Sequence, residues 1–171
     1  VEAVRPTPRV VVVGAGHVGR EVVALCHWMG LHTVLTDDRP DLCAAEAAPG
    51  ADDYVVCPMA EVPDRIAIDG DTFVVLTTRS VHVDLGGLPS LLRCAPRYLG
   101  VIGSKRRWAT TAARLREAGV PDASVARVTS PTGLELEAET PKEIALSIVS
   151  EIVMQLRGGT GGPMSPTSPP R

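Results

Sequence analysis

VVVVGAGHVG, from Val10 to Gly19, marks a buried strand that turns directly into a helix. Four successive valines predict a strand with both faces covered, because β-branched side chains suit a pleated surface and no polar residue interrupts them. The glycines predict a tight turn at Gly14, room for a phosphate against the backbone at Gly16, and close packing of the helix on the sheet at Gly19. The N–H groups and positive dipole end of that helix would then face an anion.

A carboxylate follows at a spacing that suits a bound nucleotide. A second strand is predicted over residues 32–36, and Asp37 stands at its end, 18 positions after Gly19. This spacing is close to that of the acid that binds a ribose hydroxyl in dinucleotide sites. Asp37 and the adjacent Asp38 favour a free 2′-hydroxyl, whereas Arg39 could accommodate a 2′-phosphate. The alternative interpretation is a glycine turn with an exposed aspartate.

Composition narrows the class of protein. The 171 residues suit one domain, and the net charge of −3 predicts no nucleic-acid partner and no attraction to a membrane surface. No apolar run reaches the roughly 18 residues of a membrane span, and no secretory signal opens the chain. The four cysteines form no C-x-x-C pair, so we expect a cytoplasmic protein with reduced thiols and no metal site.

The remaining sequence alternates strands with helices. A short helix is expected over residues 41–48 and a capped one from Thr140 to Leu156; the strands are expected at residues 10–13, 32–36, 54–56, 72–76, 98–102 and 125–129. This alternation predicts an α/β fold of three layers, a doubly wound parallel (Rossmann-like) sheet of about six strands in the order 3-2-1-4-5-6. Residues 1–8 are expected to be a lead-in, residues 9–157 the domain, and residues 158–171 a disordered tail.

Three loops are predicted to meet at the carboxyl ends of the strands, where doubly wound sheets bind ligands. They are residues 14–19, residues 77–80 with Thr77 and Thr78, and residues 103–107. In the third loop, Gly103, Ser104 and Lys105 open a helix. Cations are unfavourable at a helix N-terminus unless an anion shares the site, so Ser104 and Lys105 are predicted to bind a phosphate. For Arg106 and Arg107, a solvated basic turn remains the equal alternative.

The sequence assigns no catalytic residue. His17 and Val18 lie inside the glycine loop, where their backbone N–H groups matter more than the His17 ring. His82 and Asp84 could act as acid and base near the second loop. No set of nucleophile, base and orienting residue can be assembled, however, so the chemistry stays unassigned.

Three motifs together resemble the xanthine dehydrogenase accessory (XdhC/CoxI) family, in its C-terminal Rossmann domain. The first is YLGVIGSKRR, residues 98–107; the second is SPTGL, residues 130–134, taken with TPKEIALSIVSEI, residues 140–152. The third is the opening GAGHV with DDRP, residues 37–40. The run TRSVHVD, residues 78–84, departs from the family's pattern, because serine replaces a glycine and the histidine comes one place late.

The resemblance implies a maturation factor rather than an enzyme. Members of the family bind the molybdenum cofactor (molybdopterin), which carries a phosphate or a dinucleotide. They pass it to a molybdenum hydroxylase apoenzyme of the xanthine or CO dehydrogenase type, commonly after insertion of a sulfido ligand, which implies a cysteine desulfurase as a further partner. The protein itself would supply no ligands to the metal. Self-association as a homodimer is expected through an edge strand or the last helix.

Two other functions remain open from the residues alone. An NAD(H)-dependent oxidoreductase would use the same glycine loop and Asp37, but would also need a substrate-binding part and a proton-transfer residue. A nucleotide-sensing regulatory module would share the glycine loop and the terminal aspartate. It would not share the motifs at residues 103–107 and 130–134. Fold alone cannot separate the three functions.

Overall fold

Six parallel strands form the sheet at the centre of the computed structural model, which describes residues 8–78 and 80–165. The strand order is β3-β2-β1-β4-β5-β6, so the predicted doubly wound, Rossmann-like topology is confirmed. The order reverses between β1 and β4, which are neighbours in the sheet. The strands are β1 (Arg9–Val13), β2 (His32–Asp37), β3 (Asp53–Val56), β4 (Thr72–Leu76), β5 (Tyr98–Val101) and β6 (Val128–Thr129).

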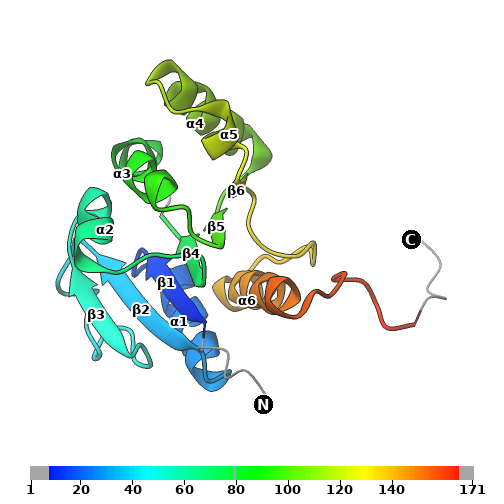
Figure 1. The fold of residues 1–171 in the computed structure, drawn as a ribbon. Helices are drawn as coiled ribbons and strands as arrows, with labels where there is room; N and C mark the ends of the chain where they lie inside the picture. The colour runs from blue at the N-terminus through cyan, green and yellow to red at the C-terminus, as the bar shows by residue number, and fades with distance from the viewer. Residues whose placement is uncertain (1–7, 79, 166–171) are drawn as a thin grey trace, which may run out of the picture.

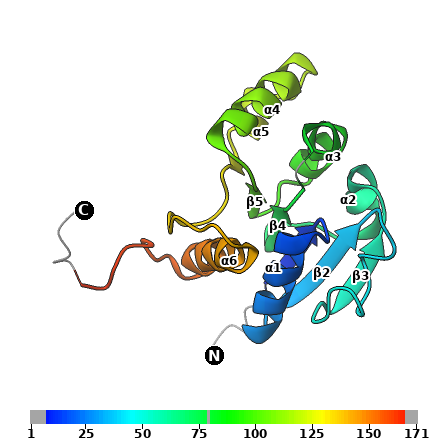
Figure 2. The same cartoon turned by 180° about the vertical axis from the view of Figure 1, so that it is seen from behind.

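Helices cover both faces of the sheet, as Figure 1 and, from behind, Figure 2 show. Two of them, α1 and α6, lie side by side on one face, and α2, α3 and α4 pack on the other. The helices are α1 (His17–Trp28), the 3₁₀ turn η1 (Met59–Glu61), α2 (Val62–Arg65), α3 (Val81–Cys94), α4 (Lys105–Glu117), α5 (Asp122–Val125) and α6 (Pro141–Arg157).

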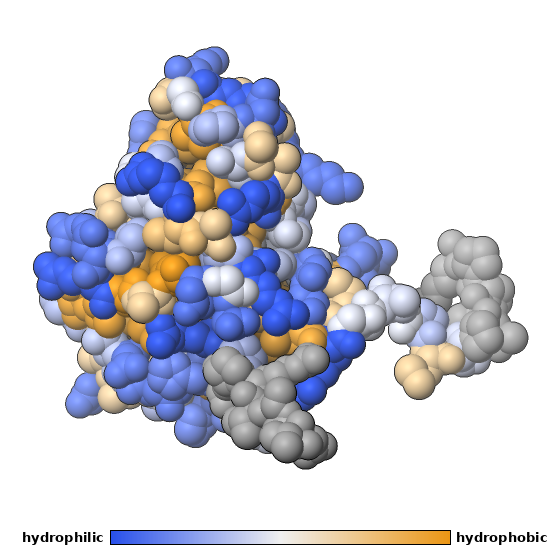
Figure 3. All heavy atoms as spheres, viewed as in Figure 1, coloured by the Kyte–Doolittle hydropathy of each residue, from blue (hydrophilic) through white to orange (hydrophobic). Residues whose placement is uncertain are grey.

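The core is aliphatic and divided in two by the sheet. Val10 and Val12 of β1 point toward α1 and α6, whereas Val11 and Val13 point toward α2, α3 and α4. All four valines are buried, as their uninterrupted run predicts. On the face of the molecule in Figure 3, polar side chains cover most of the surface and apolar areas lie between them. Burial on both faces holds the carboxyl ends of the strands, and therefore the loops that follow them, in fixed positions.

Two local predictions are wrong. Residues 41–48 form separate turns instead of a helix, because Cys43 turns inward, with its thiol near the carbonyl oxygens of Leu35 and Val55. The sixth strand was expected over residues 125–129 but contains only Val128 and Thr129. The residues before it form α5, which buries Val125 in the core. In both places tertiary contacts override the local pattern.

The last helix begins as its sequence predicts. The Thr140 hydroxyl accepts a hydrogen bond from the Glu143 amide, the Glu143 carboxylate accepts one from the Thr140 amide, and Gly158 ends the helix at a φ of 74°. Beyond it, residues 158–165 form no helix or strand. The rest of the expected tail and most of the expected lead-in lie outside the described residues. Within the described part, no helix has the length and apolar character to cross a membrane.

Candidate functional site

In the glycine loop between β1 and α1, the structure requires glycine at two positions and leaves open space at the third. Gly14 has a φ of +114°, a backbone conformation that is strained for any residue with a side chain. Glycine at this position therefore allows the tight turn. A Cβ on Gly19 would overlap the Gly14 carbonyl oxygen and lie 2.8 Å from the Thr77 hydroxyl oxygen. A Cβ on Gly16 would meet nothing within 4 Å among the described residues. Gly14 and Gly19 therefore shape the loop, and Gly16 leaves open space in front of it.

That open space belongs to a cavity of about 570 Å³ at the N-terminus of α1. Gly16 is the N-cap residue of α1, and no described side chain caps this helix N-terminus. The first-turn N–H groups are therefore available to an anion, which the helix dipole also favours. The cavity brings together most of the predicted site residues: Gly14, Gly16, His17, Val18, Asp37, Asp38, Arg39, Thr77 and Thr78, with Ser80 and Val83.

Thr77 holds the loop rather than facing a ligand with its hydroxyl. The Thr77 hydroxyl lies 2.8 Å from the Gly14 carbonyl oxygen, to which it donates, and the Thr77 amide donates to the Val13 carbonyl at 2.9 Å. These contacts join the ends of β1 and β4 on either side of the point where the strand order reverses. The glycine loop is thus fixed before any ligand binds.

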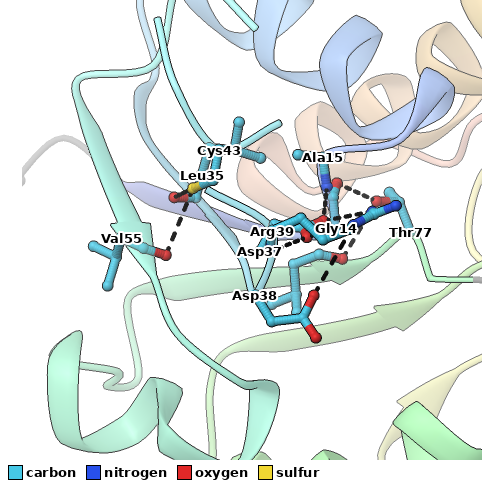
Figure 4. A network of polar contacts seen from close by, with 10 residues as sticks. Gly14, Ala15, Leu35, Asp37, Asp38, Arg39, Cys43, Val55 and Thr77 are labelled. Atoms are coloured by element: carbon cyan, nitrogen blue, oxygen red, sulfur yellow. Dashed lines mark hydrogen bonds and ion pairs between the residues drawn. The ribbon is translucent and has the colours of Figure 1, made fainter. Parts of the chain in front are cut away.

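Asp37 is the most heavily bonded group at the site (Figure 4). Its Oδ2 accepts from the Ala15 amide at 2.6 Å and from Arg39 Nη2 at 2.9 Å. Its Oδ1 accepts from the Arg39 amide at 2.9 Å and from Arg39 Nε at 2.8 Å. A carboxylate offers about four acceptor positions, so protein donors occupy all of them. A ribose hydroxyl can bind here only if Arg39 moves, whereas the neighbouring Asp38 side chain is 68% exposed.

The same contacts set the acidity of Asp37. Burial alone would raise the pKa of this carboxyl, but the hydrogen bonds and charge of Arg39 and the hydrogen bond from Ala15 outweigh it and lower the pKa to about 2. The anion is therefore stabilised by the loop and by Arg39, and it ties the end of β2 to the glycine loop.

His17 adds a donor beside the helix N-terminus. Its ring Nδ1 lies 3.1 Å from the Arg20 guanidinium, one turn further along α1. Because guanidinium only donates, Nδ1 of the neutral ring must accept, and the ring proton then sits on Nε2. His17 lines the 570 Å³ cavity, whereas the Arg20 guanidinium, which it contacts, is not among the lining residues.

The third predicted loop lies on a different cavity, of about 580 Å³. Gly103, Ser104 and Lys105 line it opposite residues 131–138, and it shares no lining residue with the cavity at α1. The Ser104 hydroxyl accepts a hydrogen bond from the Arg107 amide at 3.1 Å and so caps α4. The structure thus unites the first two predicted loops and places the third on a separate, neighbouring surface.

Arg107 connects the two regions, which sequence reasoning did not foresee. Its stem crosses Gly103, where a Cβ would lie 3.3 Å from Arg107 Cδ. Its Nη2 then donates to the Asp84 carboxylate at 2.7 Å and to the Thr78 carbonyl at 3.1 Å. Asp84 is 1% exposed and bound to Arg107 and Thr78, so it is not available as the acid or base considered above. His82 is exposed and lines neither cavity.

A second buried carboxylate shapes the wall of the 580 Å³ cavity. Glu151, on α6, accepts hydrogen bonds from the Tyr98 hydroxyl and the Gly133 amide, both at 2.6 Å. The Tyr98 hydroxyl also contacts the Thr132 hydroxyl. These bonds fix the SPTGL segment against α6, and Gly133 is required there because a Cβ would overlap the Ser147 hydroxyl. A glutamate inside the apolar stripe of the last helix was the signal that could have revealed this contact.

Comparison with known families decides the identity of the domain. Residues 10–152 match the family described as the XdhC Rossmann domain. The chain belongs to the XdhC family. This match covers the glycine loop, Asp37, the Arg107 bridge and α6 as far as residue 152, so the site described above lies wholly within the XdhC domain.

Three relatives are similar over half or more of this XdhC domain. Uncharacterized protein YqeB of Escherichia coli is 30% identical over 164 residues, and a probable xanthine dehydrogenase subunit from Bacillus subtilis is 28% identical over 153 residues. These alignments cover 95% and 90% of the chain. Molybdenum cofactor insertion chaperone PaoD of Escherichia coli is 29% identical over 85 residues, half of the chain. The alignments cover 30%, 44% and 27% of these relatives, respectively.

A solved structure supports the same assignment. A xanthine dehydrogenase from Bacillus halodurans has a TM-score of 0.78 to this chain and is 32% identical. The similarity covers 96% of the XdhC domain and 46% of that protein. The domain thus spans less than half of each of these relatives. Within the described residues, no group of three or more His, Cys, Asp or Glu side chains could hold a metal ion.

Proposed function

We propose that this XdhC domain binds the phosphorylated end of the molybdenum cofactor for an accessory factor that serves a molybdenum hydroxylase. The observation that carries the proposal is the open cavity at the N-terminus of α1. There Gly16 leaves room for a phosphate, and no described side chain occupies the first-turn amides. The similarity to a molybdenum cofactor insertion chaperone supports the choice of ligand and of partner.

The cavity suits the phosphate or pyrophosphate of the cofactor rather than its metal. The first-turn backbone N–H groups of α1 supply donors and the positive end of the helix dipole there. The pterin and its metal would supply the redox chemistry once inside the hydroxylase. The domain's own contribution is to bind and orient the cofactor before transfer to the apoenzyme, with a cysteine desulfurase as the source of sulfur.

An NAD(H)-dependent oxidoreductase is the second candidate, because the same fold and glycine loop suit a dinucleotide. One observation weighs against it. The Asp37 carboxylate, which would bind the ribose hydroxyls, is saturated by Ala15 and Arg39. NAD binding would therefore require Arg39 to leave a buried carboxylate, whereas binding of a phosphate at α1 requires no such movement.

Calorimetry with molybdopterin, NAD and inorganic pyrophosphate tests the proposal. We expect molybdopterin to bind, and Gly16→Val to abolish its binding because the isopropyl group fills the space in front of the amides. Gly70→Val is the matched control, since Gly70 also has open space around it, lies outside the cavity and has no positive φ. Steady NADH oxidation with a small substrate, or molybdopterin binding that survives Gly16→Val, would overturn the proposal.

A second measurement tests the role as an accessory factor. Cofactor-free molybdenum hydroxylase would be incubated with molybdopterin alone, with molybdopterin and the unmodified protein, and with molybdopterin and the Gly16→Val variant. We expect faster recovery of hydroxylase activity with the protein than with free cofactor, and no such gain with Gly16→Val. Equal recovery in all three samples would contradict a function in cofactor insertion.

A further inference from the structure

A buried carboxylate is hydrogen-bonded to Thr78, which lines the cavity at α1. Asp84, in the first turn of α3, is 1% exposed. Its Oδ1 accepts the proton of the Thr78 hydroxyl, and its Oδ2 lies 2.7 Å from Arg107 Nη2. The same Nη2 donates to the Thr78 carbonyl at 3.1 Å. Two hydrogen bonds therefore hold Thr78, one through its side chain and one through its backbone.

This arrangement fixes the direction of the Thr78 hydroxyl. A hydroxyl has one proton and two lone pairs. The carboxylate of Asp84, paired with a guanidinium, can only accept, so the proton of Thr78 points toward Asp84. The Thr78 hydroxyl oxygen then offers only its lone pairs to a further partner. Lone pairs attract N–H and O–H groups and repel phosphate oxygens.

Thr78 is placed where that polarity matters. It lines both the 570 Å³ cavity at α1 and an adjoining hollow of about 250 Å³, which Asp37 and Asp38 also line. It is half-buried, and its amide nitrogen would lie 3.3 Å from a Cβ on Gly14, so it borders the glycine turn directly. A ligand whose phosphate sits on α1 therefore has its next chemical groups near Thr78.

We propose that Asp84 and Arg107 are positioning residues that make Thr78 a hydrogen-bond acceptor only, and that the cavity thereby selects cofactors with an O–H or N–H group next to their phosphates. The inference rests on the proposed function and narrows its ligand class. One end of the cavity attracts negative oxygen, at the α1 amides. The Thr78 oxygen, beside the glycine turn, takes a hydroxyl, amino or amide group and rejects a further phosphate. A nucleotide or a pterin satisfies both contacts, and a bare polyphosphate does not.

A purely structural function is the competing explanation, because the Asp84–Arg107 pair also joins α3 to α4. Removing one partner of a buried ion pair destabilises a protein whatever its ligand. The two explanations differ in what they predict for Thr78. If the pair only joins two helices, the hydroxyl of Thr78 has no effect on which ligand binds.

Thr78→Val is the decisive variant, with Thr78→Ser as its matched control. Valine keeps the shape and removes the hydroxyl, while serine keeps the hydroxyl. Binding of ADP, molybdopterin and inorganic pyrophosphate would be measured by calorimetry. We expect Thr78→Val to weaken ADP or molybdopterin about five- to tenfold, as the loss of one hydrogen bond implies, and to change pyrophosphate affinity less than about twofold. Thr78→Ser should bind all three as the unmodified protein does.

Asp84→Asn provides an independent check. The asparagine amide can donate to Thr78, so the hydroxyl proton becomes available to the cavity. We expect tripolyphosphate to bind more tightly to Asp84→Asn than to the unmodified protein and ADP to bind less tightly. In the Thr78→Val background, Asp84→Asn should change neither affinity further. Circular dichroism reports whether Asp84→Asn folds; if it does not, Thr78→Val still decides the question.

The outcomes separate the two proposals. If the unmodified protein binds none of the phosphorylated probes, the proposed function fails and this inference with it. If it binds ADP or molybdopterin and Thr78→Val binds them equally well, the proposed function stands and the assignment of Thr78, Asp84 and Arg107 is overturned. An equal loss for pyrophosphate and for ADP would also overturn it, because the hydroxyl would then act on the loop as a whole.

Discussion

Asp37→Asn tests how strongly the glycine loop depends on its buried carboxylate. The pKa of Asp37 is lowered from an ordinary value of 3.8 to about 2. At about 1.4 kcal/mol for each tenfold change in acidity, this corresponds to about 2.5 kcal/mol of folding stability. The Asp37 side chain is 4% exposed but that of Arg39 is 56% exposed, so solvent screens part of this interaction. Asparagine keeps one acceptor for Ala15 but loses the charge that holds Arg39, so we expect a loss of about 2 kcal/mol at pH 7.

The stabilisation by Asp37 should depend on pH in one direction. Because the folded pKa lies below the unfolded one, the stabilisation is complete above about pH 4 and is lost as the pH falls through 2. Urea unfolding of Asp37→Asn and of the unmodified protein should therefore differ most at neutral pH and converge near pH 2. Asp38→Asn is the control, because that side chain is 68% exposed and should change stability by less than about 0.5 kcal/mol. A constant difference from pH 7 to pH 2 would refute the electrostatic explanation.

Four further variants test other contacts, three of them by thermal and chemical unfolding and one by titration. Gly19→Ala should destabilise the fold by about 2 kcal/mol or more because its Cβ overlaps the Gly14 carbonyl, while Gly16→Ala, in open space, should lose less than about 1 kcal/mol. Thr140→Ala should lose about 1 kcal/mol with the cap of α6. Burial and the Glu151 carboxylate both raise the pKa of Tyr98, so Glu151→Gln should lower it in a spectrophotometric titration, and an unchanged tyrosine titration would contradict the contact.

The features that the sequence predicts correctly depend on local physics. Four valines in a row can be satisfied only in a strand buried on both faces, and β1 is such a strand. The positive φ of Gly14 and the overlap of a Cβ at position 19 with the Gly14 carbonyl both arise within the same turn. The capping box at Thr140 uses groups three residues apart. In each case neighbouring residues contain most of the information.

The features that the sequence does not reveal depend on pairs that lie far apart in the chain. Asp84 and Arg107 are 23 residues apart, and Tyr98 and Glu151 are 53 apart. Before the fold is known, the run at residues 105–107 predicts a phosphate contact at Lys105 and leaves a solvated basic turn as the equal alternative for Arg106 and Arg107. The pairing arises because β4 and β5 are neighbours, which brings the loops after them together. Long-range contact also explains the failed helix at residues 41–48, where packing of Cys43 outweighs a weak helical preference.

The GSKRR motif at residues 103–107 contributes to the walls of two cavities. Ser104 caps α4, Lys105 lines the 580 Å³ cavity, and Arg107 passes over Gly103 to reach the wall of the other cavity. Breaking a buried ion pair by removing one partner costs about 3–5 kcal/mol. A charged hydrogen bond from a ligand at Lys105 contributes about 1.5–3 kcal/mol. A ligand at Lys105 therefore supplies too little free energy to separate Arg107 from Asp84. The ion pair stays in place between the two cavities, and we predict that ligands bind the two cavities independently.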